Sequence, residues 1–271
     1  MDGNRADSTS VSSPGRRAAI VGGVALAAGL VWYGPDWVRG RIGRTFEFEP
    51  LEAPEGFRRI SASGATSSGA NPLLGLQETR TTVDDDALAA VRRDICGALF
   101  GPEPIPHAVM PVASFSDYYC PYCRVLTQKL AGLEEELQGR IRVAWHEWPI
   151  FGEGSETAAK AALAAAEQGA YVAFHNRMMR SGFFPTPHYL QDLAADIGLD
   201  ADRLLVDMES AGIAAALVKS RALALIFGFP GTPALLVGRT VVVGNIDRAT
   251  LLALVEVERQ EGAPPGCAVR A

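Results

Sequence analysis

The C-terminal part of the chain carries two kinds of apolar pattern, one typical of strands and one typical of helices. Short continuous or alternating apolar runs predict four strands, at 108–115, 141–148, 234–237 and 240–243. Pro111 interrupts the first run, so we expect it at an edge, at a bulge or before the strand proper. Apolar residues at helical spacing predict helices over 120–139 and about 248–261, the second N-capped by Asp247. This order of elements indicates an α/β fold.

A long Ala-rich stretch between the second and third predicted strands has helical periodicity. Glycines and prolines divide it into four predicted helices, at 157–180, 188–197, 201–211 and 213–227. We therefore expect an all-helical insertion domain over about residues 155–227. A further helix is predicted at 84–100, before the first strand, because three aspartates at 84–86 suit a helix start and Gly101 suits its end.

The N-terminal part has one apolar run between polar segments. Residues 1–15 are polar and Ser-rich, which predicts a disordered tail. Residues 16–38 open with two arginines, continue as a small-residue apolar run and end among aromatic residues, which predicts a transmembrane signal anchor. A signal peptide cleaved at a small-residue site (25–27) and a buried soluble helix are the alternatives. Three arginines precede the run and three follow it closely, so charge bias leaves the orientation open.

The segments that connect or follow these elements have little apolar pattern. Residues 39–83 contain a Gly/Ser/Ala-rich run at 61–72 and are predicted to be a flexible tether. Residues 263–271 are predicted to be a C-terminal tail.

Composition excludes one class of partner. The 271 residues include 25 Lys and Arg against 31 Asp and Glu, which gives a formal net charge of −6. Nucleic-acid binding requires a basic surface, so we expect no nucleic-acid partner. A hydrophobic content of 48% over this length is sufficient to form a globular core.

Two of the four cysteines stand in the motif Cys-Pro-Tyr-Cys at the predicted start of a helix. There the free amide groups and the helix dipole would stabilise a thiolate on Cys120 and lower its pKa. We expect Cys120 at an exposed position, where it attacks or is attacked, and Cys123 beneath it, where it resolves the mixed disulfide. The pattern predicts a redox-active dithiol.

A zinc half-site and a purely structural disulfide are the alternatives for this pair. A zinc site needs a second pair of ligands at suitable spacing. The chain has no second CxxC, and its four histidines are scattered singly. We therefore expect no metal and no cofactor.

The segments FSDYYCPYC and GTPALLVG, together with the long helical insertion, resemble the DsbA-like thioredoxin-fold thiol:disulfide oxidoreductases. The resemblance covers about residues 105–262. It implies a thioredoxin-like α/β fold, in which a mixed sheet of four or five strands is flanked by helices and interrupted by the helical insertion domain. The N-terminal transmembrane or signal helix, predicted from the apolar run, would precede this fold. The resemblance also implies that Cys120 is the nucleophile and Cys123 the resolving cysteine. Pro233 would be the cis-proline facing the motif, and the backbone of Thr232 would pair with an extended substrate.

The chain departs from the family pattern at three positions. Ser114 stands where well-known members carry a buried acid six residues before the first cysteine. Asp117 and Glu147 are candidates for a proton shuttle, with a solvated loop acid and a strand-end acid as the plain alternatives. Between the cysteines stand Pro121 and Tyr122, and because a tyrosine cannot become a cation beside the thiolate, we predict a weaker oxidant with a less depressed Cys120 pKa. The threonine before Pro233 resembles isomerases and reductases more than oxidases.

The other two cysteines lie outside the motif. Cys96 is near the apolar face of the helix predicted at 84–100, and Cys267 is in the Gly/Pro-rich tail. In an oxidising compartment the two could form a structural disulfide. The alternative is a buried Cys96 and a free tail thiol.

Together these features predict a single-pass protein of the inner (cytoplasmic) membrane with a periplasmic or otherwise extracytoplasmic thiol:disulfide oxidoreductase domain. Its expected partners are cysteine-containing exported proteins, a membrane redox partner and, through the N-terminal helix, the lipid bilayer. A soluble periplasmic protein is the alternative if the signal is cleaved. The functional alternatives are a disulfide reductase or isomerase of the same fold, and a non-catalytic thiol- or metal-binding module.

Overall fold

The computed structural model describes residues 45–61, 64–68, 83–182, 184–262 and 267. Residues 46–271 belong to one compact unit. The tail predicted at 1–15 and the membrane segment predicted at 16–38 lie outside the described residues. Within the described ranges, no helix is both long and apolar enough to cross a membrane.

A six-stranded mixed sheet forms the centre of the fold, in the order β1-β2-β6-β5-β3-β4. Its strands are β1 Phe48–Pro50, β2 Arg58–Ile60, β3 Met110–Ser116, β4 Ile141–Glu147, β5 Ala234–Val237 and β6 Thr240–Val243. β3 runs parallel to β4 and antiparallel to β5, and β5 runs antiparallel to β6. These four strands confirm the sequence prediction. Pro111 lies within β3 but precedes the part paired with β5, which begins at Val112.

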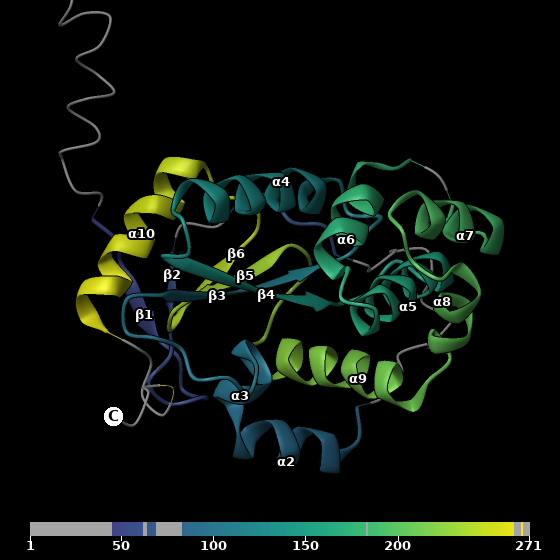
Figure 1. Cartoon of the computed structure of the whole chain (residues 1–271). Coiled ribbons are helices and arrows are strands. Elements are labelled where there is room, and N and C mark those ends of the chain that lie inside the picture. The colour runs from purple at the N-terminus through teal and green to yellow at the C-terminus, as the bar shows by residue number, and fades with distance from the viewer. Residues whose placement is uncertain (1–44, 62–63, 69–82, 183, 263–266, 268–271) are drawn as a thin grey trace, which may run out of the picture. The chain divides into compact units, whose positions relative to one another are not determined.

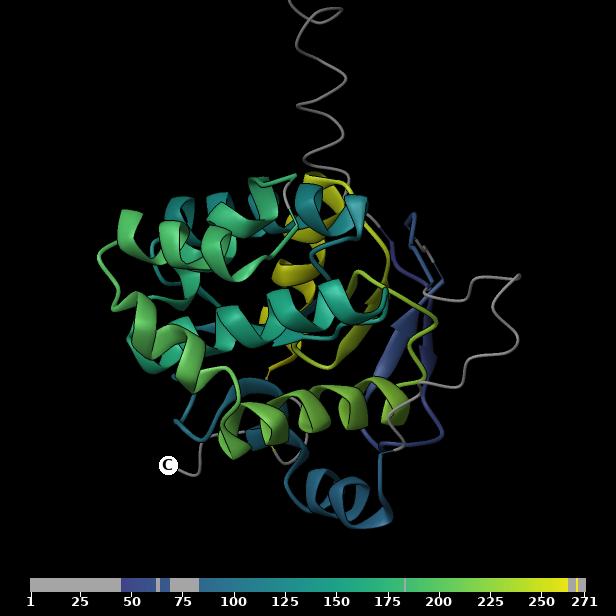
Figure 2. The same ribbon diagram turned by 90° about the vertical axis from the view of Figure 1, so that its right-hand side faces the viewer.

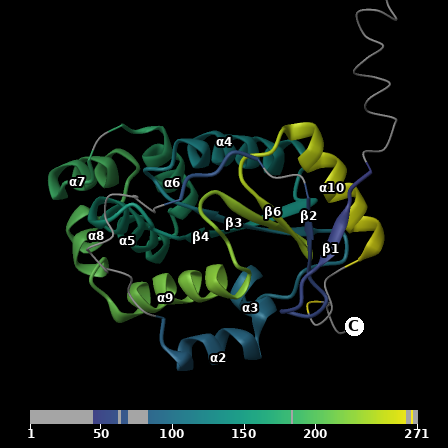
Figure 3. The same cartoon turned by 180° about the vertical axis from the view of Figure 1, so that it is seen from behind.

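The first two strands correct two predictions. The sheet has six strands rather than four or five, and residues 39–83 are not simply a flexible tether. β2 pairs parallel to β6, and β1 pairs antiparallel to β2 at the sheet edge (Figure 3). Arg58 in β2 donates to the buried carboxylate of Glu258, with an N···O distance of 2.6 Å. Strands of three residues are too short to show a period, so only this pairing and the contact with Glu258 reveal them.

Helices cover both faces of the sheet (Figure 1). α4 (Pro121–Glu136) and α10 (Arg248–Glu261) pack their leucines on the face that includes Val112 and Leu235. α2 (Asp85–Arg93), α3 (Ile95–Phe100) and α9 (Ala211–Ile226) pack on the opposite face, which includes Ala113 and Leu236. The alternation of faces follows from the strand period of two. Asp247 caps α10 by accepting from the Thr250 amide, as predicted.

The predicted insertion contains five helices rather than four. α5 (Glu153–Glu167), α6 (Tyr171–Arg180), α7 (Pro187–Asp196) and α8 (Ala201–Asp207) precede α9. Figure 2 shows this helical part from the side opposite β1 and β2. The stretch 157–180 is divided because Gly169 adopts a φ of 75°, which ends the first helix. Because the apolar residues keep helical spacing on both sides of Gly169, the sequence pattern did not reveal the break between α5 and α6.

The helix predicted at 84–100 is also two helices. Asp94 lies between α2 and α3 and caps α3 by accepting a hydrogen bond from the Gly97 amide at 2.9 Å. Asp84 caps α2 in the same way through the Ala87 amide, as the sequence indicated. A short polar side chain that can bond its own backbone ends one helix and starts the next here.

Candidate active site

The two cysteines of the motif lie at the start of α4. β3 ends at Ser116, and Cys120 is the N-cap of the helix that follows. Pro121 occupies the first turn, where its missing amide hydrogen costs nothing. The Sγ atom of Cys120 accepts a hydrogen bond from the Cys123 amide at 3.3 Å. Both cysteines are free thiols in this structure.

The surroundings of Cys120 favour its thiolate. Its pKa is lowered from 9.0 to about 6, first because the Cys123 thiol donates a hydrogen bond to it. Burial opposes this shift, while Thr232, the Cys123 amide and the Ser67 side chain add to it. Cys120 is therefore mostly a thiolate at neutral pH and ready for thiol–disulfide exchange.

Cys123 has the opposite electrostatics. Burial raises its pKa well above 9.0, and the hydrogen bond to Cys120 and the charge of the Cys120 thiolate raise it further. It packs among apolar residues shared by α4 and the helical insertion, and none of its surface is exposed. The pair thus consists of one stabilised thiolate and one proton-holding thiol.

The loop before β5 faces this pair. The Thr232–Pro233 peptide bond is cis. When Cys120 is protonated, its thiol donates a hydrogen bond to the carbonyl oxygen of Thr232, with an S···O distance of 3.4 Å. The structure therefore brings together Cys120, Cys123, Thr232 and Pro233 from two distant parts of the chain. Tyr122, between the cysteines, is 37% exposed and lies at the surface.

A residue that sequence reasoning missed completes this arrangement. Ser67, within the segment predicted to be a tether, pairs antiparallel with Thr232. Cys120 is 0% exposed, which corrects the prediction of an exposed nucleophile. Small residues at 61–72 predicted a flexible coil, and no signal in the sequence shows that residues 64–68 pair with the loop before β5.

Asp117 and Glu147 are both buried, so the alternative of a solvated loop acid is wrong for Asp117. The Asp117 carboxylate accepts hydrogen bonds from the Ser155 hydroxyl at 2.6 Å and from the amides of Tyr119 and Ile150 at 2.7 Å each. Burial raises the pKa of Asp117, and these hydrogen bonds oppose the rise. The carboxylate thus fastens the loop before Cys120 to the start of the helical insertion.

Glu147 ends β4 and connects it to the insertion. One of its oxygens accepts from the hydroxyls of Tyr118 at 2.7 Å and Tyr171 at 2.5 Å, with His175 at 3.2 Å. Burial and the adjacent Glu147 charge raise the pKa of both tyrosines well above 10.0. Ser114, at the position where family members carry an acid, is buried in β3.

The described residues hold no cluster of three or more His, Cys, Asp or Glu side chains suited to a metal. His146 and His175 are buried at separate places in the core, and His188 is on the surface beside Asp192. None of these histidines joins the dithiol.

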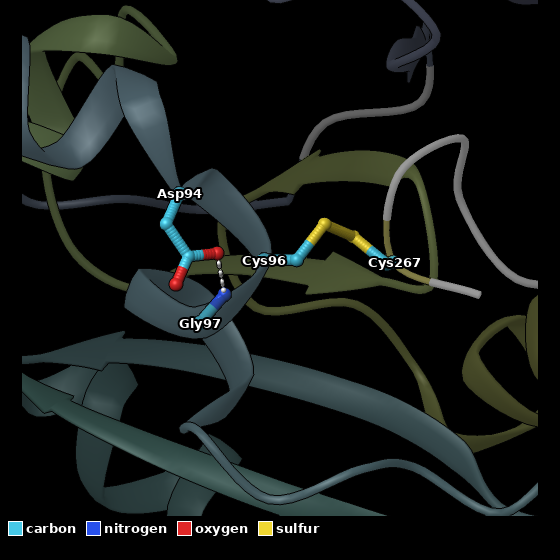
Figure 4. The surroundings of a disulfide bond; sticks show 4 residues. All are labelled: Asp94, Cys96, Gly97 and Cys267. Carbon is cyan, nitrogen blue, oxygen red and sulfur yellow. Dashed lines mark hydrogen bonds between the residues drawn. A yellow bond between two sulfur atoms is a disulfide. The ribbon is translucent and has the colours of Figure 1, made fainter. Parts of the chain in front are cut away.

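Cys96 and Cys267 form a disulfide on the side of the molecule near α3. Their Cα atoms are 5.2 Å apart, and 171 positions separate them in the sequence (Figure 4). Cys96 lies in the first turn of α3, between the cap residue Asp94 and Gly97, so the bridge attaches Cys267 to this short helix.

A thioredoxin-like sheet with a CxxC dithiol at a helix start and a facing cis-proline defines the class of thiol:disulfide oxidoreductases. The family model of the DSBA-like thioredoxin domain matches residues 111–256, and the chain belongs to this family.

Individual relatives agree with the family match. A thioredoxin-like oxidoreductase from Silicibacter pomeroyi DSS-3 is 37% identical, with a TM-score of 0.56 over 60% of this chain and 97% of that one. The fold is shared with the thiol-disulfide exchange protein alpha-DsbA2 from Wolbachia pipientis, which is 23% identical with a TM-score of 0.55, over 64% of this chain and 95% of that one.

A curated relative is much longer. The Na(+)/H(+) antiporter NhaA from Herminiimonas arsenicoxydans is 26% identical over 160 residues, which are 59% of this chain and 25% of the antiporter. The chain therefore spans about a quarter of the length of the curated relatives it matches.

Proposed function

We propose that the protein is a membrane-tethered extracytoplasmic thiol:disulfide oxidoreductase that exchanges disulfides with exported proteins through Cys120 and Cys123. The observation that carries this proposal is the division of roles between the two thiols. The pKa of Cys120 is lowered to about 6, whereas that of the buried Cys123 is raised well above 9.0. A structural thiol pair has no need of such a difference.

The proposed reaction begins with the Cys120–Cys123 disulfide. A substrate thiolate attacks the Cys120 sulfur, the Cys120–Cys123 bond breaks, and Cys123 leaves with the electron pair and takes up a proton. A second substrate thiolate then attacks the substrate sulfur of the mixed disulfide and releases Cys120 as a thiolate. Two substrate thiols have lost two electrons to the enzyme dithiol. The low pKa of Cys120 favours the last step because it makes this sulfur a good leaving group.

The substrate backbone is proposed to pair with Thr232. The carbonyl oxygen of Thr232 lies 3.4 Å from the Cys120 sulfur, which supports this role. An extended peptide added here would bring its own cysteine to the nucleophile.

The pKa of Cys120 bears on the strength of the proposed oxidant. The pKa of Cys120, about 6, lies well above the value of about 3.5 of the strongly oxidising DsbA. A less stabilised thiolate corresponds to a less oxidising disulfide. We therefore propose a moderate oxidant that depends on a membrane redox partner for its reoxidation.

The extracytoplasmic location is supported by the second pair of cysteines. A structural disulfide such as Cys96–Cys267 persists in oxidising compartments and is rare in the cytosol. The membrane tether is proposed from the apolar run at 16–38.

Two assays on the purified full chain test the proposed function. The wild type should both reduce insulin in the presence of dithiothreitol and promote refolding of a reduced, disulfide-containing protein. Cys120→Ser should lose both activities, whereas Cys123→Ser should accumulate mixed disulfides. Inactivity of the wild type in both assays would refute the proposal. The Cys120–Cys123 reduction potential, measured against glutathione, distinguishes an oxidase from a reductase or isomerase.

A further inference from the structure

A short segment from the N-terminal part of the chain lies against the active-site loop. We call residues 64–68 the strap. The Ser67 amide donates to the Thr232 carbonyl at 2.7 Å, and the Thr232 amide donates to the Ser67 carbonyl at 2.9 Å. Both backbone groups of Thr232 are thus engaged by the chain itself.

The strap is held along its length and not only at Ser67. The Gly64 amide donates to the carbonyl of Val243 at 2.8 Å, and the Asn245 amide donates to the carbonyl of Ala65 at 3.0 Å. Two backbone bridges, Ala65 with Asn245 and Ser67 with Thr232, therefore connect the strap to the open end of the β5–β6 hairpin, where the chain enters β5 and leaves β6. This is the antiparallel geometry that an added peptide strand adopts.

The fit between the strap and the loop depends on small residues. A Cβ atom at Gly231 would lie 2.4 Å from the Ser67 carbonyl oxygen, and one at Gly64 would lie 2.2 Å from the Asn245 carbonyl oxygen. Both distances are too short for a real contact, so only glycine permits this approach of the two backbones.

The strap covers the nucleophile as well as the backbone. The Ser67 side chain is near enough to Cys120 to help lower the pKa of its thiol, and both Cys120 and Thr232 are 0% exposed. A substrate cysteine that is to reach Cys120 needs the position that Ser67 now occupies.

We infer that the strap is an internal substrate mimic that blocks the active site until it is displaced. This inference rests on the proposed function, in which substrates pair with Thr232. Ser67 marks the position of the substrate cysteine, and its neighbours Thr66 and Ser68 indicate the class of substrate: an extended, unfolded polypeptide with small residues beside its cysteine. A folded or bulky partner would fail to replace the strap.

Because a substrate must first displace the strap, the closed strap lowers the apparent affinity for substrates. The affinity is reduced by the fraction of molecules whose site is open, so a site open in about one molecule in ten binds about tenfold more weakly. Any process that removes the strap would then activate the enzyme.

Alkylation of the reduced protein tests the block directly. Cys96 and Cys267 are bridged and Cys123 holds its proton, so iodoacetamide well above pH 6 reports on Cys120. Ser67→Pro removes the amide that bonds Thr232 and should accelerate alkylation by at least about tenfold. Gly231→Ala adds a Cβ atom that would clash with the Ser67 carbonyl, so it should also accelerate alkylation although the strap sequence is unchanged. Ser68→Ala keeps both backbone hydrogen bonds and should react at the wild-type rate. Thermal unfolding shows that each variant is folded.

Trapping tests the substrate-like geometry. In Ser67→Cys, the introduced thiolate should attack the Cys120 sulfur of the Cys120–Cys123 disulfide, form a new disulfide between positions 67 and 120, and release Cys123 as a thiol. The exchange conserves electrons and needs no added oxidant. Peptide mass spectrometry should find this bridge in Ser67→Cys and not in Ser68→Cys.

The outcomes separate this inference from the proposed function. Faster alkylation in the two opening variants together with the 67–120 bridge supports the block. Unchanged alkylation in folded variants overturns it, whatever their activity toward insulin. Faster alkylation in a protein that neither reduces insulin nor refolds substrates leaves the strap as a cover for Cys120 and refutes the proposed function instead.

Discussion

The hydrogen bond from Cys123 to Cys120 should set most of the reactivity of the nucleophile. It is the largest cause of the lowered Cys120 pKa, which is about 6. Replacing Cys123→Ala removes the donor and leaves the helix start in place. A hydrogen bond to a charged group contributes about 1.5–3 kcal/mol, and one pKa unit corresponds to about 1.4 kcal/mol. The pKa of Cys120 should therefore rise by about one to two units.

Thiolate absorbance in the ultraviolet, followed across a pH titration, measures this shift. Cys96 and Cys267 are bridged, so Cys120 is the titrating thiol of the variant. At neutral pH the thiolate fraction should fall from about nine-tenths to between about a half and a tenth. Cys123→Ser is the matched control, because its hydroxyl can still donate and should restore part of the shift. If both variants titrate like the wild type, the helix start and the Thr232 loop stabilise the thiolate and the reasoning fails.

Three further changes test the packing around the site. Burial lowers the pKa of His146 from 6.5 to about 4, so the folded protein takes up this proton at a lower pH than the unfolded protein does. The free energy of unfolding should therefore fall by at most ~3 kcal/mol as the pH decreases from about 6.5 toward 4. His146→Gln should remove this pH dependence from urea-unfolding measurements. Arg58→Met removes the closer of the two ion pairs of the buried Glu258 carboxylate and leaves only Arg239, at 4.0 Å; the free energy of unfolding should fall by about 3 kcal/mol in urea titrations. Cys96→Ser removes the disulfide to Cys267, which closes a loop of 171 residues, and should lower the free energy of unfolding by up to about 5 kcal/mol in the same assay.

Controls for these changes come from the same chain. Arg203→Met breaks a surface ion pair with Asp207 and should cost less than about 1 kcal/mol. If Arg58→Met lowers the free energy of unfolding by no more than Arg203→Met does, the role given to the buried carboxylate of Glu258 is contradicted. Cys267→Ser should reproduce the effect of Cys96→Ser because both open one bond. A pH profile of His146→Gln that matches the wild type would exclude His146 as the source of acid sensitivity.

Local patterns were sufficient to predict the central elements of the fold. β5, β6 and α10 begin and end as predicted, because each combines an apolar period with a clear terminus such as the turn at Gly238 or the Asp247 cap. Where the local signal was weaker the prediction failed. Gly169 and Asp94 divide predicted single helices, since helical periodicity continues across both breaks.

Local sequence patterns predicted only part of the candidate site. Cys120 and Cys123 are two residues apart, so their spacing at a helix start already indicated redox chemistry. The positions of Thr232 and Pro233 followed from family resemblance rather than from any local pattern. The burial of Asp117 was missed because its partners, Ser155 and the amides near Ile150, come from a later part of the chain.

By itself, the sequence determined the dithiol, its place at a helix start, and the strand–helix order around it, because each depends on residues that are neighbours along the chain. Only the tertiary structure decided the two added strands, the burial of Cys120 and the pairing of Ser67 with Thr232. The added strands and the pairing of Ser67 with Thr232 join residues as far apart as 58 and 240 through backbone hydrogen bonds, which any residue with a free amide and carbonyl can form. Such bonds leave no mark on the amino-acid pattern, and only the folded chain brings them together.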